Sequence, residues 1–200
     1  MIDPLLYFPI GMFINYQCMS YIFPLYSFFT ALEERKKTEF ISRINSTLFQ
    51  LFMCGSYFYI KTDEDIITLY RIGTGYLIFD LVFVQTITMH IHHIVCILIY
   101  IFGLPASTAT DRLFMYRTIV TLEASPIVIT LCWMLETFQY PKNILHRVIQ
   151  VFSFLYWSSL RMIAFPYLFF TEGSTTMQLF VSPLFVLNTY WFYLLIKKIK

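Results

Sequence analysis

Long apolar stretches, separated only by short polar segments, run through this sequence from one end to the other. A helix that crosses a bilayer needs about 20 mostly apolar residues, with a range of about 17–25. Seven such stretches are present, and 58% of the residues are hydrophobic whereas only 13% are charged. A soluble globular chain is about 25% charged. The pattern therefore predicts an all-α, polytopic membrane helix bundle with about seven transmembrane helices.

The predicted spans are bounded by charged or turn-forming segments. The third and fourth follow each other without a polar loop, and we divide them near Gln85–Met89 because together they are about twice as long as one span requires. Pro9 and Pro24 are predicted to kink the first span. The spans are about Leu5–Ala31, Ile44–Ile60, Leu69–Ile87, Thr88–Leu104, Leu113–Leu135, Val148–Phe170 and Met177–Ile196. The main loops are Glu33–Arg43, Lys61–Asp65, Pro105–Arg112, Glu136–Arg147 and Thr171–Thr176.

Several other classes of protein are excluded. The apolar runs are continuous rather than alternating, which argues against a β-barrel, and no loop is long enough for a soluble domain. The net charge of +2 is too small to indicate nucleic-acid binding. The N-terminus lacks the features of a cleavable signal peptide. The four cysteines, Cys18, Cys54, Cys96 and Cys132, lie inside apolar stretches, so we expect free, buried thiols rather than disulfides.

The distribution of basic residues predicts the orientation. Lys and Arg in short loops favour the cytosolic side of a membrane. With the C-terminus in the cytosol, nine basic residues are cytosolic and three lie on the opposite side, so we predict a luminal N-terminus and a cytosolic C-terminus. The nine are Arg35, Lys36, Lys37, Arg43, Lys142, Arg147, Lys197, Lys198 and Lys200; the three are Lys61, Arg71 and Arg112.

The chain divides into a first span with its charged loop (residues 1–39), a main transmembrane domain (40–196) and a short tail (197–200). The tail reads Lys197-Lys198-Ile199-Lys200, which has the form of a dilysine signal that coat proteins recognise for retrieval to the endoplasmic reticulum. Lysines at a helix end also anchor the helix by snorkelling. Both interpretations stay open.

Charged residues inside the spans are the most informative positions. Each costs about 2.5–3.5 kcal/mol on insertion scales, so an unpaired charge is not expected to face lipid. The four such residues are Asp80, Arg117, Glu123 and Arg161. Arg117 and Glu123 are six residues apart and lie on different faces of one helix, so we do not expect them to pair. These residues indicate either a functional site or structural pairing between helices.

Three histidines, His90, His92 and His93, stand at the entrance to the fourth span. Histidine exchanges protons near neutral pH. His90 and His93 share a helix face, and His92 points about 100° away. The only other histidine is His146, too few for a membrane di-iron centre. No third ligand completes a mononuclear site, so we predict no metal.

The order of these residues resembles the TLC domain family. The matching segments are Gly75-Tyr76-Leu77-Ile78-Phe79-Asp80, then His92-His93, then Leu122-Glu123-Ala124-Ser125-Pro126 with Trp133 ten residues after the glutamate. The resemblance covers about Phe40–Ile196. It implies a polytopic membrane protein, mostly of the endoplasmic reticulum, that handles lipids. One branch, the ceramide synthases, transfers an acyl group from acyl-CoA to a sphingoid amine and requires its adjacent histidine pair.

The Glu123-x-Ser125 pattern resembles the TLC-domain-containing branch more than the ceramide synthases, and the chain also departs from both branches at particular positions. Pro126 stands where ceramide synthases carry a second acid. The TLC-domain-containing branch, whose members are linked to membrane lipid composition, typically has a histidine where this chain has Leu48, Phe49 and Gln50, and an Asn and an Arg where it has Thr130 and Cys132.

Two functions remain open. In the one we favour, the protein binds membrane lipids or regulates membrane lipid composition without catalysis. In the alternative, an acyltransferase uses His92 or His93 as general base or acyl acceptor, with acyl-CoA as substrate and no cofactor. Homo-oligomer formation stays open. The remaining candidate residues are Asp80 and Glu123 to orient the imidazole, and Arg161, Tyr76 and His90 to bind substrate. A shared site requires a histidine, a carboxylate and Arg161 to line one interior cavity.

Overall fold

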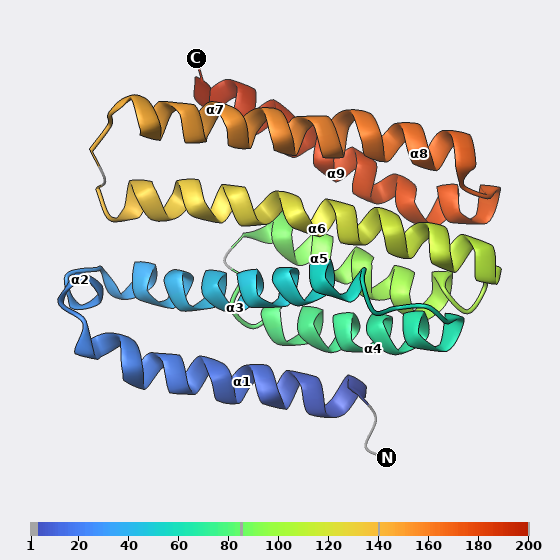
Figure 1. Ribbon diagram of the computed structural model, residues 1–200, viewed down its shortest axis with the longest axis horizontal. Helices are drawn as coiled ribbons and strands as arrows, with labels where there is room; N and C mark the ends of the chain where they lie inside the picture. The colour runs from blue at the N-terminus through green and yellow to red at the C-terminus, as the bar shows by residue number, and fades with distance from the viewer. Residues whose placement is uncertain (1–3, 85, 140, 200) are drawn as a thin grey trace.

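Seven helical rods lie roughly side by side in the computed structural model, which describes residues 4–84, 86–139 and 141–199 (Figure 1). No strand occurs in these described ranges. The all-helical prediction is therefore confirmed. The first rods are α1 (Pro4–Ile22), which is followed by the 3₁₀ turn η1 (Phe23–Leu25) and the short α2 (Ser27–Thr30), then α3 (Glu34–Ser56) and α4 (Asp63–Asp80).

Two of the remaining rods contain a π-helical segment. The rod that begins with α5 (Ile87–Leu98) continues as the π-helix η2 (Ile99–Gly103), and α7 (Ile144–Ser158) passes through the π-helix η3 (Ser159–Ala164) into α8 (Phe165–Glu172). The other two rods are α6 (Ala109–Thr137) and α9 (Thr175–Ile199). π-Helical turns are rare and often occur at functional sites.

Three helices are long and apolar enough to cross a membrane: Ala109–Thr137, Ile144–Thr171 and Thr175–Lys197. A shorter apolar helix covers Ile87–Gly103. Many large apolar side chains on the outer surface of the bundle are exposed, among them Phe152, Leu155 and Leu179. Exposed apolar surface on this scale suits a hydrocarbon environment rather than water, as expected of a membrane protein.

Several predicted loops are wrong because charged residues begin helices. Lys61–Asp65 was expected to be a loop, but α4 begins at Asp63 with Thr62 and Asp65 forming a reciprocal capping box. Such a cap satisfies two backbone N–H groups that a helix end leaves unpaired. The expected loop Pro105–Arg112 is shortened in the same way, since Thr108 and Asp111 cap α6.

The charged segment Glu33–Arg43 was also expected to be a loop and is instead the start of α3. Lys37 pairs with Glu34 at 2.7 Å and Arg43 with Glu39 at 2.8 Å. Ion pairs three or four residues apart lie on one helix face and support a helix, so charge here does not end the regular structure.

The boundary between the third and fourth rods also differs from the prediction. The helix α4 ends at Asp80, seven residues before the predicted Ile87, and α5 starts at Ile87 with Thr86 as its cap. Gln85, where we placed the division, lies outside the described residues. Pro24 lies in the 3₁₀ turn that follows α1, as the predicted kink requires, whereas Pro9 is accommodated inside α1.

Close packing joins the rods through small residues. A Cβ on Gly75 in α4 would lie 2.9 Å from Cδ of Pro9, so only glycine allows α1 to approach this closely. Of the four cysteines, all are free as predicted, but only Cys96 is buried and Cys18 is exposed on the surface of the bundle. The expectation of burial was wrong for Cys18 because α1 turns that face outward.

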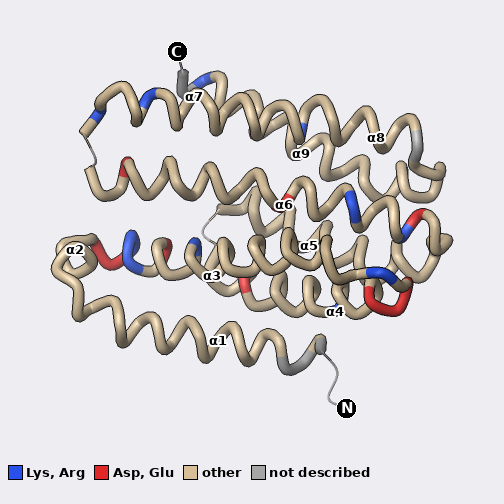
Figure 2. Tube along the Cα trace, viewed as in Figure 1, with Lys and Arg blue, Asp and Glu red and all other residues tan. Residues whose placement is uncertain are grey.

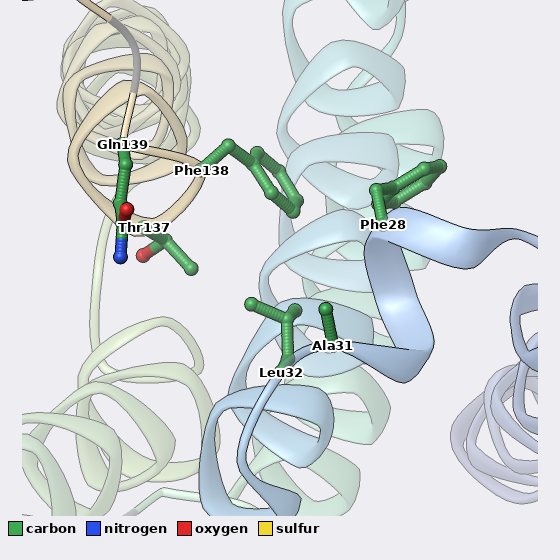
Figure 3. Close-up of a pocket in the computed structure, with 6 residues that line it drawn as sticks. All are labelled: Phe28, Ala31, Leu32, Thr137, Phe138 and Gln139. Atoms are coloured by element: carbon green, nitrogen blue, oxygen red, sulfur yellow. The ribbon is translucent and has the colours of Figure 1, made fainter.

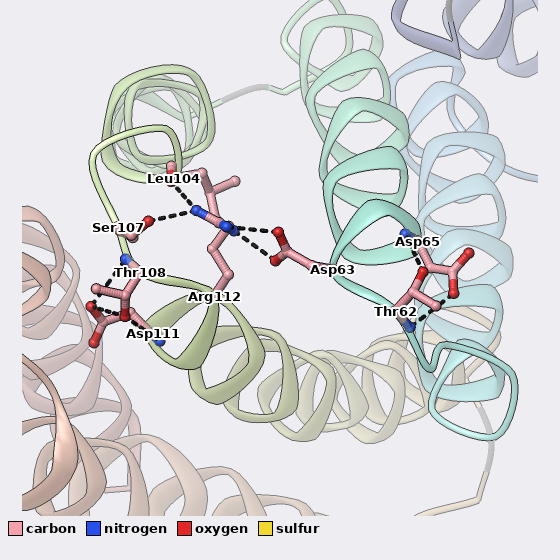
Figure 4. Close-up of polar contacts among 8 residues, drawn as sticks. All are labelled: Thr62, Asp63, Asp65, Leu104, Ser107, Thr108, Asp111 and Arg112. Carbon is pink, nitrogen blue, oxygen red and sulfur yellow. Dashed lines mark hydrogen bonds and ion pairs between the residues drawn. The ribbon is translucent and has the colours of Figure 1, made fainter.

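The two ends of the bundle differ in charge. Figure 2 shows Lys and Arg at the amino ends of α3 and α7 and near the carboxyl end of α9, which lie at one end. At the opposite end, Arg112 of α6 forms two hydrogen bonds with Asp63 of α4, at 2.7 and 2.6 Å, and also donates to the Ser107 carbonyl (Figure 4). These bonds, aided by the positive charge, lower the pKa of the Asp63 carboxyl.

Candidate functional site

A narrow cavity lies inside the bundle, between the α5–η2 rod, α6, the η3–α8 segment and α9. Its volume is about 40 Å³, which is room for about three or four water molecules at about 10–15 Å³ each. Four polar side chains reach it: His92, Glu123, Arg161 and Asn188. The other walls come from Cys96, Ile99, Tyr100, Met115, Ile119, Leu122, Phe165, Phe169, Val181 and Leu184.

Arg161 supplies the positive charge of the cavity. It belongs to the π-helix η3 and only 7% of it is exposed. Its Nε donates to Oγ of Ser125 at 3.0 Å, and one terminal nitrogen donates to Oδ1 of Asn188 at 3.2 Å. A guanidinium has five N–H donors. The two bonds hold the group between α6 and α9 and leave donors that can serve a ligand.

Glu123 is the acidic residue of the cavity. It lines the same cavity from α6. In the part of the chain that the structure describes, no hydrogen bond or ion pair joins its carboxylate to Arg161 or to another side chain. The cavity is therefore lined by a guanidinium group and a carboxyl group that do not contact each other directly.

His93 and Asp80 form a separate buried pair. Nε2 of His93 lies 2.9 Å from Oδ2 of Asp80, and Nδ1 lies 2.7 Å from the carbonyl oxygen of Met89. Because a carbonyl only accepts, Nδ1 must carry a proton. Nε2 and the carboxylate oxygen then also need a proton between them, since two lone pairs at this distance repel. Oγ of Ser42 donates to the other carboxylate oxygen at 3.4 Å.

This pair ties α5 to the carboxyl end of α4, and the Ser42 bond adds α3. Only 3% of His93 and 5% of Asp80 is exposed. Neither residue lines the cavity. Their geometry is that of a structural clasp beside the cavity.

His92 is the histidine that reaches the cavity. Its ring meets the ring of Trp191 edge to face, with centroids 5.3 Å apart, and both ring nitrogens lie within 3.9 Å of Sγ of Cys96. Among the described residues, no strong hydrogen bond fixes its tautomer. Its imidazole is therefore the proton-exchanging group available to a molecule in the cavity.

Two candidate substrate-binding residues lie elsewhere. The Tyr76 hydroxyl donates to Oγ of Ser46 at 2.8 Å, and its ring stacks on Phe49 with centroids 3.9 Å apart. Tyr76 is thus part of the α3–α4 packing. Nδ1 of His90 lies 2.9 Å from the carbonyl oxygen of Thr86, in the first turn of α5. Neither residue lines the cavity.

Arg117 does not join the interior charges. It is exposed on the outer face of α6, two turns from the helix start, so its long side chain can reach the end of the bundle by snorkelling. Arg117 and Glu123 face different directions, as predicted from their spacing. Within the described residues, no three His, Cys, Asp or Glu side chains converge closely enough to hold a metal ion.

The structure brings His92, Glu123 and Arg161 to one cavity, which meets the geometric requirement set out from the sequence. Asn188 and Ser125, which bind Arg161, were missed as functional residues. Asn188 is an amide in the middle of the apolar last helix, whereas the other amide of that helix, Gln178, lies in its first turn. This position was the available signal, because polar groups in a membrane interior need partners.

The fold and the site together define a class: a membrane helix bundle with a charged cavity in its interior. No family model, characterised protein or solved structure matches the chain.

Proposed function

We propose that this chain is a multi-pass membrane protein of the TLC type that binds membrane lipids and influences membrane lipid composition. The observation that carries the proposal is the cavity in which Arg161 and Glu123 face a shared space without pairing. Separated charges inside a membrane protein are expensive and are retained where they act on a ligand or an ion. A lipid headgroup that carries both a hydrogen-bond donor and an acceptor would satisfy the side chains of Arg161 and Glu123.

The walls of the cavity support a lipid rather than a soluble ligand. They are mostly apolar, which suits an acyl chain, and the polar side chains provide one place for a headgroup. Ligand pockets usually have volumes of about 300–1,000 Å³, whereas this one has about 40 Å³. The helices must therefore separate for a lipid to enter.

The helix α9 is the wall best suited to move. Only 11% of its most apolar stretch is buried inside the bundle, against 22% for the corresponding stretch of each of the two other candidate spans. A disulfide can test this movement at Gly103 of η2 and Phe180 of α9, which pack against each other, since a Cβ on Gly103 would lie 3.3 Å from Cγ of Phe180. In a cysteine-free background, oxidising Gly103→Cys with Phe180→Cys should exclude lipid, and reduction should restore binding. Equal binding in both states would contradict the opening.

The topology is part of the proposal. Seven spans, a luminal N-terminus and a cytosolic C-terminus agree with the gathering of basic residues at one end of the bundle and with the rule that basic residues favour the cytosol. The endoplasmic reticulum remains the proposed membrane. A C-terminal tag that is accessible after selective permeabilisation of the plasma membrane supports this orientation, and a tag protected until full permeabilisation reverses it.

The acyltransferase alternative has one observation in its favour, the imidazole of His92 at the cavity. In that reaction, His92 would take the proton of a lipid amine or hydroxyl as its nitrogen or oxygen bonds to the thioester carbon of acyl-CoA. The C–S bond then breaks, and the CoA thiolate takes that proton from His92 and leaves as free CoA. His93 would act only through the packing of α5, because Asp80 and Met89 occupy both of its nitrogens.

The lipid that co-purifies with the chain tests the proposal. Mass spectrometry of the protein purified in mild detergent should show a bound lipid class that Arg161→Gln loses. Arg117→Gln is the matched control, since it removes an arginine outside the cavity. Equal lipid content in all three proteins refutes lipid binding at the cavity.

A lipidomic comparison separates the two functions. Cells that express the wild-type chain or His92→Ala are compared with cells that express neither. An acyl-lipid class that rises with the wild type and does not rise with His92→Ala supports acyl transfer. A change in lipid composition that both proteins produce supports lipid binding without catalysis.

A further inference from the structure

A second cleft lies at the basic end of the bundle and shares no lining residue with the interior cavity. It has a volume of about 520 Å³ and opens to the outside, within the usual range of ligand pockets. Figure 3 shows its two walls: Phe28, Ala31 and Leu32 follow α1, and they face Thr137, Phe138 and Gln139 at the end of α6.

The apolar part of the cleft is built on a cluster of aromatic rings. The ring centroids of Phe28 and Phe138 are 5.3 Å apart, and those of Phe40 and Phe138 are 5.4 Å apart, both in edge-to-face contact. Phe28 is still 45% exposed and Phe138 37% exposed. The cleft therefore offers a preformed apolar surface that the chain itself does not cover.

The polar side of the cleft is set by the end of α6. Gln139 has φ of 53°, a left-handed conformation that non-glycine residues seldom adopt. This conformation ends α6 and leaves the Gln139 amide and the Thr137 hydroxyl beside the cleft (Figure 3). Both groups can donate a hydrogen bond to an anionic oxygen.

Both walls lead directly to exposed lysines. Lys36 follows Leu32 by four residues, Lys142 follows Gln139 by three, and both are exposed. The described ends of α3, α6, α7 and α9 at this side of the bundle carry seven Lys or Arg against four Glu. The cleft thus combines apolar walls with a surplus of positive charge.

We propose that this cleft binds an anionic glycerophospholipid of the cytosolic leaflet. An acyl chain lies against Phe28, Leu32 and Phe138, and the phosphate lies between Lys36 and Lys142 with Thr137 and Gln139 as donors. Charge complementarity selects this occupant, because the cytosolic leaflet is negative and each nearby lysine adds to the attraction. The inference rests on the proposed topology but not on the interior cavity.

Quenching of Trp133 by a brominated lipid tests the site. Trp133 lies four residues before Thr137, on the same face of α6, and packs on the cluster that contains Phe29 and Phe40. The full chain with Trp157→Phe and Trp191→Phe is reconstituted in phosphatidylcholine vesicles. Brominated phosphatidylserine is compared there with brominated phosphatidylcholine at equal content.

We expect the anionic lipid to quench Trp133 more strongly than the zwitterionic lipid. Lys36→Gln with Lys142→Gln should lower this preference about 25-fold, because each lysine strengthens the attraction about fivefold. Filling the cleft with Ala31→Phe should reduce quenching by both lipids. Lys61→Gln is the matched control. It removes a lysine at the opposite end of the bundle, next to the start of α4, and should leave the quenching by both lipids unchanged.

Equal quenching by the two lipids, or a preference that survives the double lysine change, overturns the site. A second outcome also overturns it. If a photo-crosslinking residue placed at position 138 links two copies of the chain and the two lipids quench equally, the cleft is a contact between copies. Arg161→Gln should leave the preference intact, so failure of the interior cavity and failure of this cleft are distinguishable. Thermal unfolding of each variant confirms that the chain is folded.

Discussion

Removing one member of the His93–Asp80 pair should destabilise the chain far more than removing both. His93→Leu leaves the Asp80 carboxylate buried, with only the Ser42 hydroxyl at 3.4 Å to satisfy it. Stranding a buried charge costs about 3–5 kcal/mol. For a chain of this size, about 2–4 °C of melting temperature corresponds to each kcal/mol, so the expected decrease is about 10 °C.

Asp80→Leu should have a smaller effect. His93 can then remain neutral, with its Nδ1 proton still donated to the Met89 carbonyl, and only the Nε2 lone pair loses its partner. An unmet buried acceptor costs about 1–3 kcal/mol. The double variant replaces the pair with apolar side chains and removes both penalties, so we expect it to melt within a few degrees of the wild type.

The assay is thermal unfolding of the purified chain in micelles, with Cys18, Cys54 and Cys132 replaced by Ser in every protein, so that a fluorogenic thiol dye reports exposure of the buried Cys96. The order of melting temperatures should be wild type and double variant highest, Asp80→Leu next and His93→Leu lowest. If the two single effects simply add in the double variant, the residues are not coupled, and the clasp described above is wrong.

Two further changes test the packing of α4. The bonds from Arg112 lower the pKa of Asp63 in the folded chain below its ordinary value of about 3.9. The stabilisation that they provide is therefore complete when the pH is above the ordinary pKa. It is lost as the pH falls through the lower pKa of the folded chain. Asp63→Asn should therefore lower the melting temperature at pH 7, and melting curves at stepwise lower pH should show that difference shrink below about pH 4; a difference that grew in acid would be contrary to this sign. Gly75→Ala should destabilise the chain by about 1–3 kcal/mol because of overpacking against α1, whereas Gly55→Ala, with nothing within 4 Å, should be neutral or stabilising; equal thermal shifts would refute the close approach.

Each predicted apolar run corresponds to one helical rod, although the first is broken by η1 into α1 and α2 and two others contain a π-helical segment, and three of the rods are long and apolar enough to cross a membrane. The helix ends could not be predicted to the same extent. Charge was taken to indicate a loop, yet Glu34 lies in the first turn of α3, where an acid favours the positive end of the helix dipole. Asp63 and Asp65 begin α4 for the same reason.

The sequence predicted which charged residues belong to the candidate site, but it did not predict which partners they contact. The cost of burying charge pointed to Asp80, Arg117, Glu123 and Arg161. Of these, Glu123 and Arg161 line the cavity, Asp80 pairs with His93 beside it, and Arg117 is exposed on the outer face. Which of two adjacent histidines faces the cavity depends on the rotation of α5 about its axis, which packing against α4 and α9 decides. Sequence spacing alone does not supply that rotation.

Photo-crosslinking of a lipid tests the central claim most directly. The full chain in vesicles is exposed to a phospholipid with a diazirine in its acyl chain, and the labelled residues are mapped by peptide mass spectrometry. The account predicts labels on cavity walls such as Ile119 and Leu184, lost in Arg161→Gln and kept in Arg117→Gln. Labels confined to outward-facing residues such as Leu155 and Leu179 in all three proteins would contradict it.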